Sequence, residues 1–320
     1  MCGPSVTLRA AGETVAQRED AIAAAVARLR AGEILAVKGI GGYHLMCAAA
    51  DADAVARLRE RKPRPHKPLA VMFPLAGEDG LDAVRRSVEL RPEEAEELLG
   101  PVRPIVLAAR RDDCPLAGNL APGLAELGVF LPYSPLHQLL TGDFGGALVA
   151  TSGNISGEPV LTDNDEAERR LARIADAFVQ HDRPIVRPAD DPVFRRVGGR
   201  VRPIRIGRGC APRELTLPWR QPEPVLAVGG HMKNTLALAW EDRVVVSPHI
   251  GDMGTPRSMQ VFEQVAADLQ SLYGVEARRV IADAHPGYDT HRWARRSGLP
   301  VDTVFHHVAH ASALAAEHGG

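Results

Sequence analysis

The chain has few cysteines and few aromatic residues, and each scarcity excludes a class of protein. Four cysteines in 320 residues, with no CxxC pair, form neither a disulfide framework nor a zinc cluster, and this usage fits a reducing compartment. Aromatic residues make up 4% of the chain, too few for a surface on which single-stranded nucleic acid stacks. The formal net charge of −2 gives no general attraction to nucleic acid or to a membrane surface.

Long hydrophobic runs are also lacking. No apolar run approaches the ~18 residues that a membrane-spanning helix needs, and the opening residues lack the charged and apolar regions of a secretory signal. We therefore expect a soluble, cytoplasmic protein with no membrane partner. A length of 320 residues is enough for two domains, each with its own core.

Strands and helices alternate along most of the chain, which predicts an α/β fold with a covered sheet. The high density of proline between 210 and 224 indicates a linker, so a second domain is expected from Val225 onward. Hydrophobic spacing predicts helices at 13–31, 51–62, 87–99, 135–140, 163–178, 258–273 and 306–318. It predicts strands at 34–38, 69–73, 104–108, 147–151, 235–240, 243–247 and 280–283, with a further strand from Val225.

A basic segment covers the end of the second predicted helix and the residues that follow it. Six basic side chains fall between Arg57 and Lys67, with Glu60 as the only acid, and three prolines make the end of the segment stiff. Rigidly placed cations suit a phosphate or carboxylate ligand, because little conformational freedom is lost on binding. A solvated helix end with ordinary surface charges is the alternative at this point.

Two loops follow predicted strands, at the position where open α/β sheets bind ligands. Ser152 and Asn154 offer a hydroxyl and an amide in the loop after the strand at 147–151, although local hydrogen bonding also explains such a loop. The glycine cluster Gly39–Gly42 follows the strand at 34–38. Its backbone amides can approach an anion, and a tight turn is the alternative reading.

Taken together, Lys62-Pro-Arg64 with Lys67 and then Ser152-Gly-Asn154 resemble the K-x-R … S-x-N signature of the YrdC family. The resemblance covers residues 13–208 and implies a YrdC-like open twisted sheet with helices, which binds ATP with Mg²⁺ and forms a carbamoyl-type adenylate. It implies that the three cations hold phosphates and that Ser152 and Asn154 orient the nucleotide or carbamate. Two further candidates for ligand binding are Arg205 and, for the carbamate carboxylate, Lys38.

Longer motifs resemble the HypF branch, the [NiFe]-hydrogenase maturation carbamoyltransferases. They are Lys38-Gly-Ile-Gly-Gly-Tyr-His-Leu, Arg61-Lys-Pro-Arg-Pro-His-Lys-Pro-Leu, Thr151-Ser-Gly-Asn-Ile-Ser-Gly and Asp182-Arg-Pro-Ile. The tRNA-modifying relatives carry Pro-Thr-Glu in place of residues 38–40. The resemblance implies that the full enzyme releases carbamate from carbamoyl phosphate, activates it with ATP, and transfers the carbamoyl group to the C-terminal cysteine of HypE.

Motifs beyond residue 224 resemble the TsaD-like domain of the same branch, an actin/hexokinase-type (ribonuclease-H-like) ATPase domain. They are Gly229–Thr235, Ser247–Asp252, His285–Tyr288 and Phe305–His310. His306 and His310 are four residues apart, so on a helix their imidazoles share one face and can bind one metal ion. By resemblance the metal is zinc or iron and its third ligand lies beyond Gly320, so we expect an incomplete site.

These comparisons predict an internal piece of a longer protein. We assign 1–12 to the tail of a zinc-finger-like region, 13–209 to the YrdC-like domain, 210–224 to a linker and 225–320 to a truncated TsaD-like domain. Without an acylphosphatase-like domain, we expect no turnover from carbamoyl phosphate to HypE. Two alternatives remain open: a tRNA threonylcarbamoyl-adenylate synthase, and a double-stranded-RNA-binding module that uses the basic segment, although nucleic acid is not the partner we expect.

Overall fold

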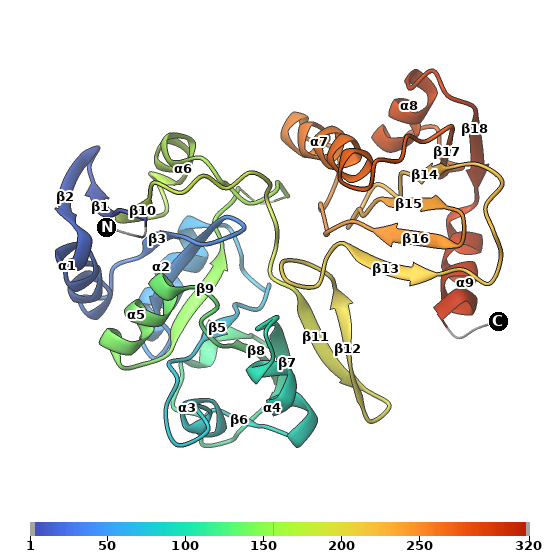
Figure 1. The fold of residues 1–320 in the computed structure, drawn as a ribbon. Coiled ribbons are helices and arrows are strands. Elements are labelled where there is room, and N and C mark those ends of the chain that lie inside the picture. Colours follow the sequence, from blue (N-terminus) through green and yellow to red (C-terminus); the bar gives the residue numbers. More distant parts are fainter. Residues whose placement is uncertain (1–3, 156, 318–320) are drawn as a thin grey trace. The chain divides into compact units, whose positions relative to one another are not determined.

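The computed structural model describes residues 4–155 and 157–317, which form two compact units (Figure 1). The first unit contains the described residues up to 209, apart from 157–159, and the second contains those from 210 onward. Each unit has its own mixed sheet and its own hydrophobic core. Cys2, which we assigned to a zinc-finger-like tail, lies outside the described residues.

The strands of the first unit are β1 (Val6–Ala10), β2 (Glu13–Gln17), β3 (Leu35–Lys38), β4 (Tyr43–Ala48), β5 (Val71–Met72), β6 (Val88–Glu89), β7 (Ile105–Arg110), β8 (Glu126–Phe130), β9 (Leu148–Ser152), β10 (Ala177–His181), β11 (Val193–Val197) and β12 (Arg200–Arg205). Its helices are α1 (Arg18–Arg30), α2 (Ala52–Arg61), α3 (Asp82–Arg85), α4 (Pro92–Leu99), the short 3-10 helix η1 (Gly118–Leu120), α5 (Pro135–Phe144) and α6 (Asn164–Leu171). The sheet runs β12-β11-β7-β8-β5-β9-β4-β3-β10-β1-β2, with β6 beside β7.

The core of the first unit lies between the central strands and helices α1 and α5 (Figure 1). Helix α1 buries Ile22, Val26 and Leu29, the face that helical spacing predicts. Strand β3 is buried along its whole length, as its continuous apolar sequence indicates. Helix α5 begins at Pro135, where the Ser134 hydroxyl accepts a hydrogen bond from a backbone N–H of the first turn.

The second unit is smaller and its sheet runs β13-β16-β15-β14-β17-β18. These strands are β13 (Arg213–Thr216), β14 (Val225–Ala227), β15 (Ala237–Trp240), β16 (Arg243–Val246), β17 (Arg279–Asp283) and β18 (Val301–Val304), and the helices are α7 (Pro256–Tyr273), α8 (Asp289–Arg296) and α9 (His306–Glu317). Strands β14, β17 and β18 are parallel, so their carboxyl ends share one edge of the sheet. Helix α7 packs its apolar face on this sheet.

The structure confirms the α/β class and corrects several predicted boundaries. Residues 13–17 form β2, and 88–89 form β6, so the helices predicted at 13–31 and 87–99 begin later, at Arg18 and Pro92. The helix predicted at 163–178 ends at Leu171, and its last residues enter β10, which pairs in parallel with β3. Spacing cannot separate the end of a helix from a short buried strand when both are apolar.

Several strands lie where no strand was predicted. The Arg-rich stretch before residue 209 contains the hairpin β11–β12 at the edge of the first sheet. Residues 6–10, within the segment assigned to a zinc-finger-like tail, form β1. Within the segment assigned to a linker, β13 pairs with β16. None of the described helices is long and apolar enough to cross a membrane.

Candidate functional site

Lys62 and Arg64 reach the loop at the end of β9 from the end of α2. The Lys62 ammonium donates hydrogen bonds to the Ser152 backbone carbonyl and, at 2.9 Å, to Asn154 Oδ1. Arg64 Nη1 donates to Thr151 Oγ1 at 2.8 Å. The proline-flanked basic segment and the Ser–Asn loop therefore meet in one place, although they lie far apart in the sequence.

Local structure fixes where the two cations lie. Asp51 caps α2 by accepting hydrogen bonds from two backbone N–H groups, and Lys62 is the C-cap residue that follows Arg61. The loop beyond it is organised by Arg59, whose guanidinium donates to four backbone carbonyls. These belong to Arg64, Lys67, Asn119 and Leu120, at 2.6–2.9 Å. In the sequence, Arg59 is only one of the six basic side chains between Arg57 and Lys67, and nothing there indicates this role.

Lys62 is buried and Arg64 is half-buried, and no carboxylate among the described residues pairs directly with either. The Lys62 side chain is 2% exposed, and burial, reinforced by the charge of Arg64, holds its pKa well below the ordinary value. Burial also lowers the pKa of Arg64, and the charge of Arg205 adds to this shift. Among residues 4–155 and 157–317, neither Lys62 nor Arg64 forms an ion pair with a carboxylate, although Asp190 acts on both through space. Such a site favours binding of an anion.

The remaining predicted cations differ in their placement. Arg205 donates through Nε and Nη2 to the Asp191 backbone carbonyl at 3.0 and 2.7 Å, and its charge lowers the pKa of Arg64. We call Lys62, Arg64 and Arg205 the cation cluster. Lys67 is exposed, and its charge acts on Lys62. Lys38 is buried and donates to the His181 carbonyl at 3.0 Å, so the structure does not bring its ammonium to the cluster.

The glycines that follow β3 form a tight turn. The N–H of Gly39 donates to the Gly42 carbonyl at 2.8 Å. A Cβ on Gly41 would collide with the Ala189 carbonyl oxygen, and one on Gly42 would collide with the side chain of Val160. Close packing of neighbouring segments explains these glycines, which favours the tight-turn interpretation.

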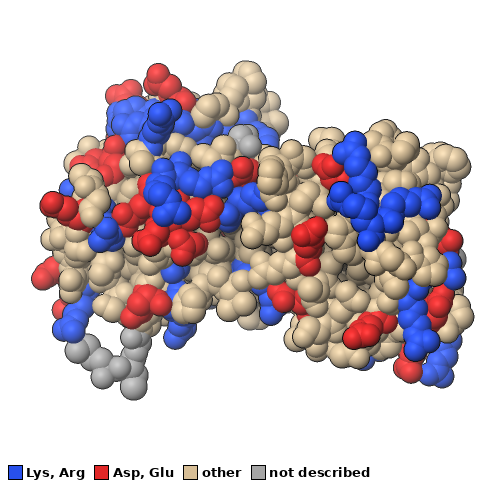
Figure 2. Space-filling view, turned by 90° about the horizontal axis from the view of Figure 1, so that it is seen from above, with Lys and Arg blue, Asp and Glu red and all other residues tan. Residues whose placement is uncertain are grey.

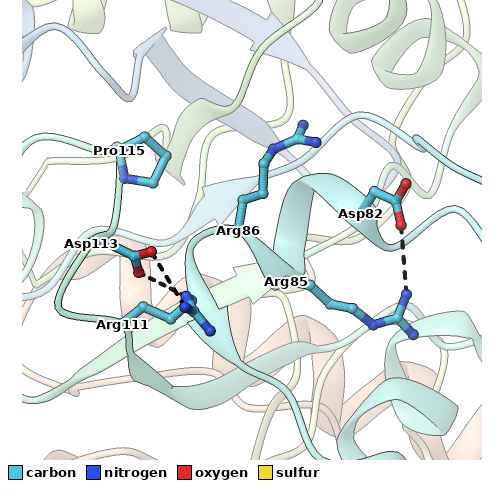
Figure 3. A pocket seen from close by; sticks show the side chains of 6 residues that line it. All are labelled: Asp82, Arg85, Arg86, Arg111, Asp113 and Pro115. Carbon is cyan, nitrogen blue, oxygen red and sulfur yellow. Dashed lines mark hydrogen bonds and ion pairs between the residues drawn. The ribbon is translucent and has the colours of Figure 1, made fainter.

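The basic segment does not form an open cationic surface. Arg57 donates to the Gly32 carbonyl, Arg61 pairs with Asp176 at 2.7 Å, and Arg59 is buried. On the face shown in Figure 2, acidic side chains are interspersed with basic ones. A surface pocket near α3 holds three arginines, but Arg111 is paired with Asp113 at 2.8 Å and Arg85 with neighbouring aspartates (Figure 3). These features weaken the RNA-binding alternative.

In the second unit, the predicted histidine pair lies at the start of α9. The Nε2 atoms of His306 and His310 are 3.1 Å apart, and His306 Nδ1 contacts Asp283 Oδ2 at 2.7 Å. Two nitrogens at this separation can both lie about 2.1 Å from one zinc ion, and a carboxylate on Nδ1 orients the ring for binding. In the described part of the chain no group of three or more histidine, cysteine or acidic residues could hold a metal ion.

The family model of Sua5, YciO and YrdC, described as telomere recombination, matches residues 27–207. Because the match covers more than half of the chain, the chain belongs to the Sua5/YciO/YrdC family. A second family model, the HypF Kae1-like domain, matches residues 220–317. With both domains in this order, the chain resembles carbamoyltransferase HypF over its whole described length.

Individual relatives support this assignment. Carbamoyltransferase HypF of Synechocystis sp. is 43% identical over 96% of this chain and 40% of the relative, and that of Rhodobacter capsulatus is 44% identical over 99% and 42%. A crystal structure of full-length HypF in the phosphate- and nucleotide-bound form matches with a TM-score of 0.92 and 38% identity, covering 100% of this chain and 41% of that one. The chain thus spans about two fifths of these relatives.

A different enzyme resembles the first unit alone. Threonylcarbamoyl-AMP synthase of Halorhodospira halophila is 31% identical over 58% of this chain and 90% of the relative. The first unit therefore has relatives that carry it without the second.

Proposed function

We propose that this chain is the adenylate-forming part of a carbamoyltransferase of [NiFe]-hydrogenase maturation. The observation that carries the proposal is the cation cluster at the polar loop that ends β9, in which Lys62 is buried, Arg64 and Arg205 are half-buried, and no cation is paired with a carboxylate of the described residues. The relative solved with phosphate and nucleotide bound supports a nucleotide as the anion that binds here. The proposed substrates are ATP and carbamate.

In the proposed reaction, a carbamate oxygen attacks the α-phosphorus of ATP. A new bond forms between that oxygen and phosphorus, the bond from phosphorus to the bridging oxygen breaks, and pyrophosphate leaves with the electron pair. The cation cluster binds the phosphates and stabilises the charge that develops on the leaving group. Ser152 and Asn154 orient the nucleotide or the carbamate, and positioning with charge stabilisation suffices without a nucleophilic side chain.

The steps before and after adenylation involve the longer protein. We propose carbamoyl phosphate as the source of carbamate, and the C-terminal cysteine of HypE as the acceptor of the carbamoyl group. Mg²⁺ enters with ATP and neutralises part of the phosphate charge. His306 and His310 would hold a zinc or iron ion in the second unit, where a divalent ion supplies Lewis-acid chemistry.

Calorimetric titration with Mg·ATP tests the proposal. We expect the parent chain to bind ATP, and Arg64→Ala to weaken binding by about 100-fold, because a guanidinium–phosphate contact is lost. Arg111→Ala, which removes an exposed arginine paired with Asp113, is the matched control and should leave affinity unchanged. No binding by the parent, or equal affinity in Arg64→Ala, would refute the proposal.

The likeness to threonylcarbamoyl-AMP synthase supports one second candidate. That activity would release pyrophosphate from ATP only when L-threonine and bicarbonate are both present. A pyrophosphate-release assay with and without L-threonine distinguishes the two, because carbamate activation does not depend on the amino acid.

A further inference from the structure

Asp191, which precedes β11, connects three parts of the first unit. Its carboxylate accepts hydrogen bonds from His44 on β4 at 2.7 Å and from Nε of Arg208 at 2.6 Å. Its backbone carbonyl accepts both hydrogen bonds from Arg205 of the cation cluster. The three side chains in the carboxylate network are each no more than 10% exposed. Asp191 is therefore a buried junction between β4, the β11–β12 hairpin and the cluster.

His44 lies beside the cluster because of the register of the sheet. Strands β4 and β9 are antiparallel, and His44 is directly opposite Ser152. Opposite residues of an antiparallel pair project to the same face, with Cβ atoms about 5 Å apart. The Lys62 ammonium donates to the Ser152 carbonyl, so the imidazole is next to the loop that meets the cations.

Arg208 holds Asp191 in place from the other side. Its two terminal nitrogens donate to the carbonyls of Val102 and Arg103 at 2.8 and 2.9 Å, and its guanidinium stacks on the Tyr133 ring at 3.3 Å. Each of the three guanidinium nitrogens of Arg208 thus makes a hydrogen bond, and the guanidinium is held in one orientation against the Asp191 carboxylate. Burial raises the pKa of Asp191, but the hydrogen bonds and electrostatic interactions with His44 and Arg208 hold it far below its ordinary value, so the carboxylate remains ionised.

The second oxygen of the Asp191 carboxylate, Oδ2, contacts Nε2 of His44. This contact gives the imidazole one orientation, in which Nδ1 is directed toward the Tyr133 hydroxyl. The contact between Nδ1 and the Tyr133 hydroxyl is long, at 3.4 Å, so the hydrogen bond to Asp191 is the stronger of the two that orient the ring.

We propose that Asp191 is a positioning residue of the nucleotide site. Its carboxylate fixes His44 opposite Ser152, and its carbonyl fixes Arg205 next to Arg64, so both side chains are oriented toward a bound phosphate or carbamate before the ligand arrives. This inference rests on the proposed function and adds two residues, His44 and Asp191, to the site. Preorganisation of this kind strengthens binding because the side chains lose little freedom when the ligand binds.

Asp191→Asn tests the inference with little change in shape. It keeps the carbonyl that binds Arg205 but removes the charge that holds His44 and Arg208. We expect ATP affinity to fall about ten-fold or more, the change expected when a charge-assisted hydrogen bond is lost. Asp113→Asn is the matched control, since Asp113 also accepts from an arginine Nε but is 72% exposed in the pocket of Figure 3. Its affinity should equal that of the parent.

A second pair of variants separates positioning from simple structural support. His44→Gln retains an N–H donor for the Asp191 carboxylate and should bind ATP within about three-fold of the parent, whereas His44→Ala should lose about ten-fold or more. In an Asp191→Asn background the advantage of glutamine over alanine should disappear. Circular dichroism at the assay temperature establishes that each variant is folded.

The outcomes distinguish this inference from the proposed function. If the parent binds ATP and Arg64→Ala does not, but Asp191→Asn and His44→Ala bind like the parent, the positioning role is refuted and the nucleotide site stands. If Asp191→Asn does not fold, equal affinities of His44→Ala and His44→Gln refute the role. If the parent fails to bind ATP, both proposals fail.

Discussion

Lys62→Met removes a buried ammonium while keeping an unbranched side chain of similar length. The variant loses hydrogen bonds to the Ser152 carbonyl and Asn154, each worth about 1.5–3 kcal/mol for a charged donor. It also removes the desolvation penalty of the buried charge, which is several kcal/mol per ion, and the electrostatic repulsion between the Lys62 ammonium and the Arg64 guanidinium. These contributions oppose each other, so we expect the free energy of unfolding to change by no more than about 2 kcal/mol.

The effect of the same substitution on ATP binding should be much larger. A unit positive charge about 4 Å from a phosphate charge contributes roughly 4 kcal/mol at an effective dielectric constant of about 20. Folding has already desolvated Lys62, so little of this energy is lost to desolvation when ATP binds. We expect affinity to fall by about 2–4 kcal/mol, or roughly 30- to 1,000-fold.

Urea unfolding and calorimetric titration of the same samples measure both quantities. Arg85→Met, which removes an exposed arginine paired with Asp79, should change neither, and it controls for the loss of one positive charge. The reasoning is refuted if Lys62→Met lowers the free energy of unfolding by more than about 3 kcal/mol while affinity falls less than ten-fold. Lys62 would then support the fold and not the ligand.

Three further predictions concern protonation, the loop and the histidine pair. Burial lowers the pKa of Lys62 in the free protein, and bound phosphates raise it. The protein should therefore take up protons when it binds ATP, and its affinity for ATP should fall as the pH rises between the two pKa values of Lys62. Calorimetric titrations in buffers of different ionisation enthalpy measure this proton uptake, which should vanish in Lys62→Met. Arg59→Lys keeps the charge but cannot reach four carbonyls, so thermal unfolding should show a loss of about 2–4 kcal/mol, and an unchanged melting temperature would contradict the structural role of Arg59. His310→Ala should reduce zinc binding in equilibrium dialysis, whereas His66→Ala, at an exposed position of the first unit, should not; equal binding by both would contradict a metal role for the pair.

Much of the fold was predictable because its hydrophobic spacing is regular. The buried face of α1 and the apolar run of β3 follow directly from their sequences. The hairpin β11–β12 was not predictable in this way. Strand β12 is at the edge of the sheet, has arginine at three of its six positions and contains Pro203, so its sequence resembles a polar loop.

The candidate site was predictable only where its residues form a local motif. Lys62 and Arg64 are two residues apart, as are Ser152 and Asn154, and the family signature joins the two pairs. His44 and Asp191 are 147 residues apart and meet because of strand register and a loop that no spacing rule describes. The contact between His44 and Asp191 could therefore be identified only in the three-dimensional structure.

The six basic side chains of the segment show why composition alone could not assign the site. Arg57, Arg59 and Arg61 each bond to a backbone carbonyl or a carboxylate, and Lys67 is exposed. Among the described residues neither Lys62 nor Arg64 has an ion pair, and burial lowers the pKa of both, which is unfavourable for stability unless a ligand compensates. Arg59 is also buried, but its guanidinium donates to four backbone carbonyls. The fold maintains this arrangement through contacts that do not involve the ligand: the Asp51 cap of α2 and the carbonyls that Arg59 holds. The residues that carry the unfavourable charges, Lys62 and Arg64, are thus different from Asp51 and Arg59, which hold the surrounding backbone in place. Substitutions can remove one of these pairs of residues and leave the other intact.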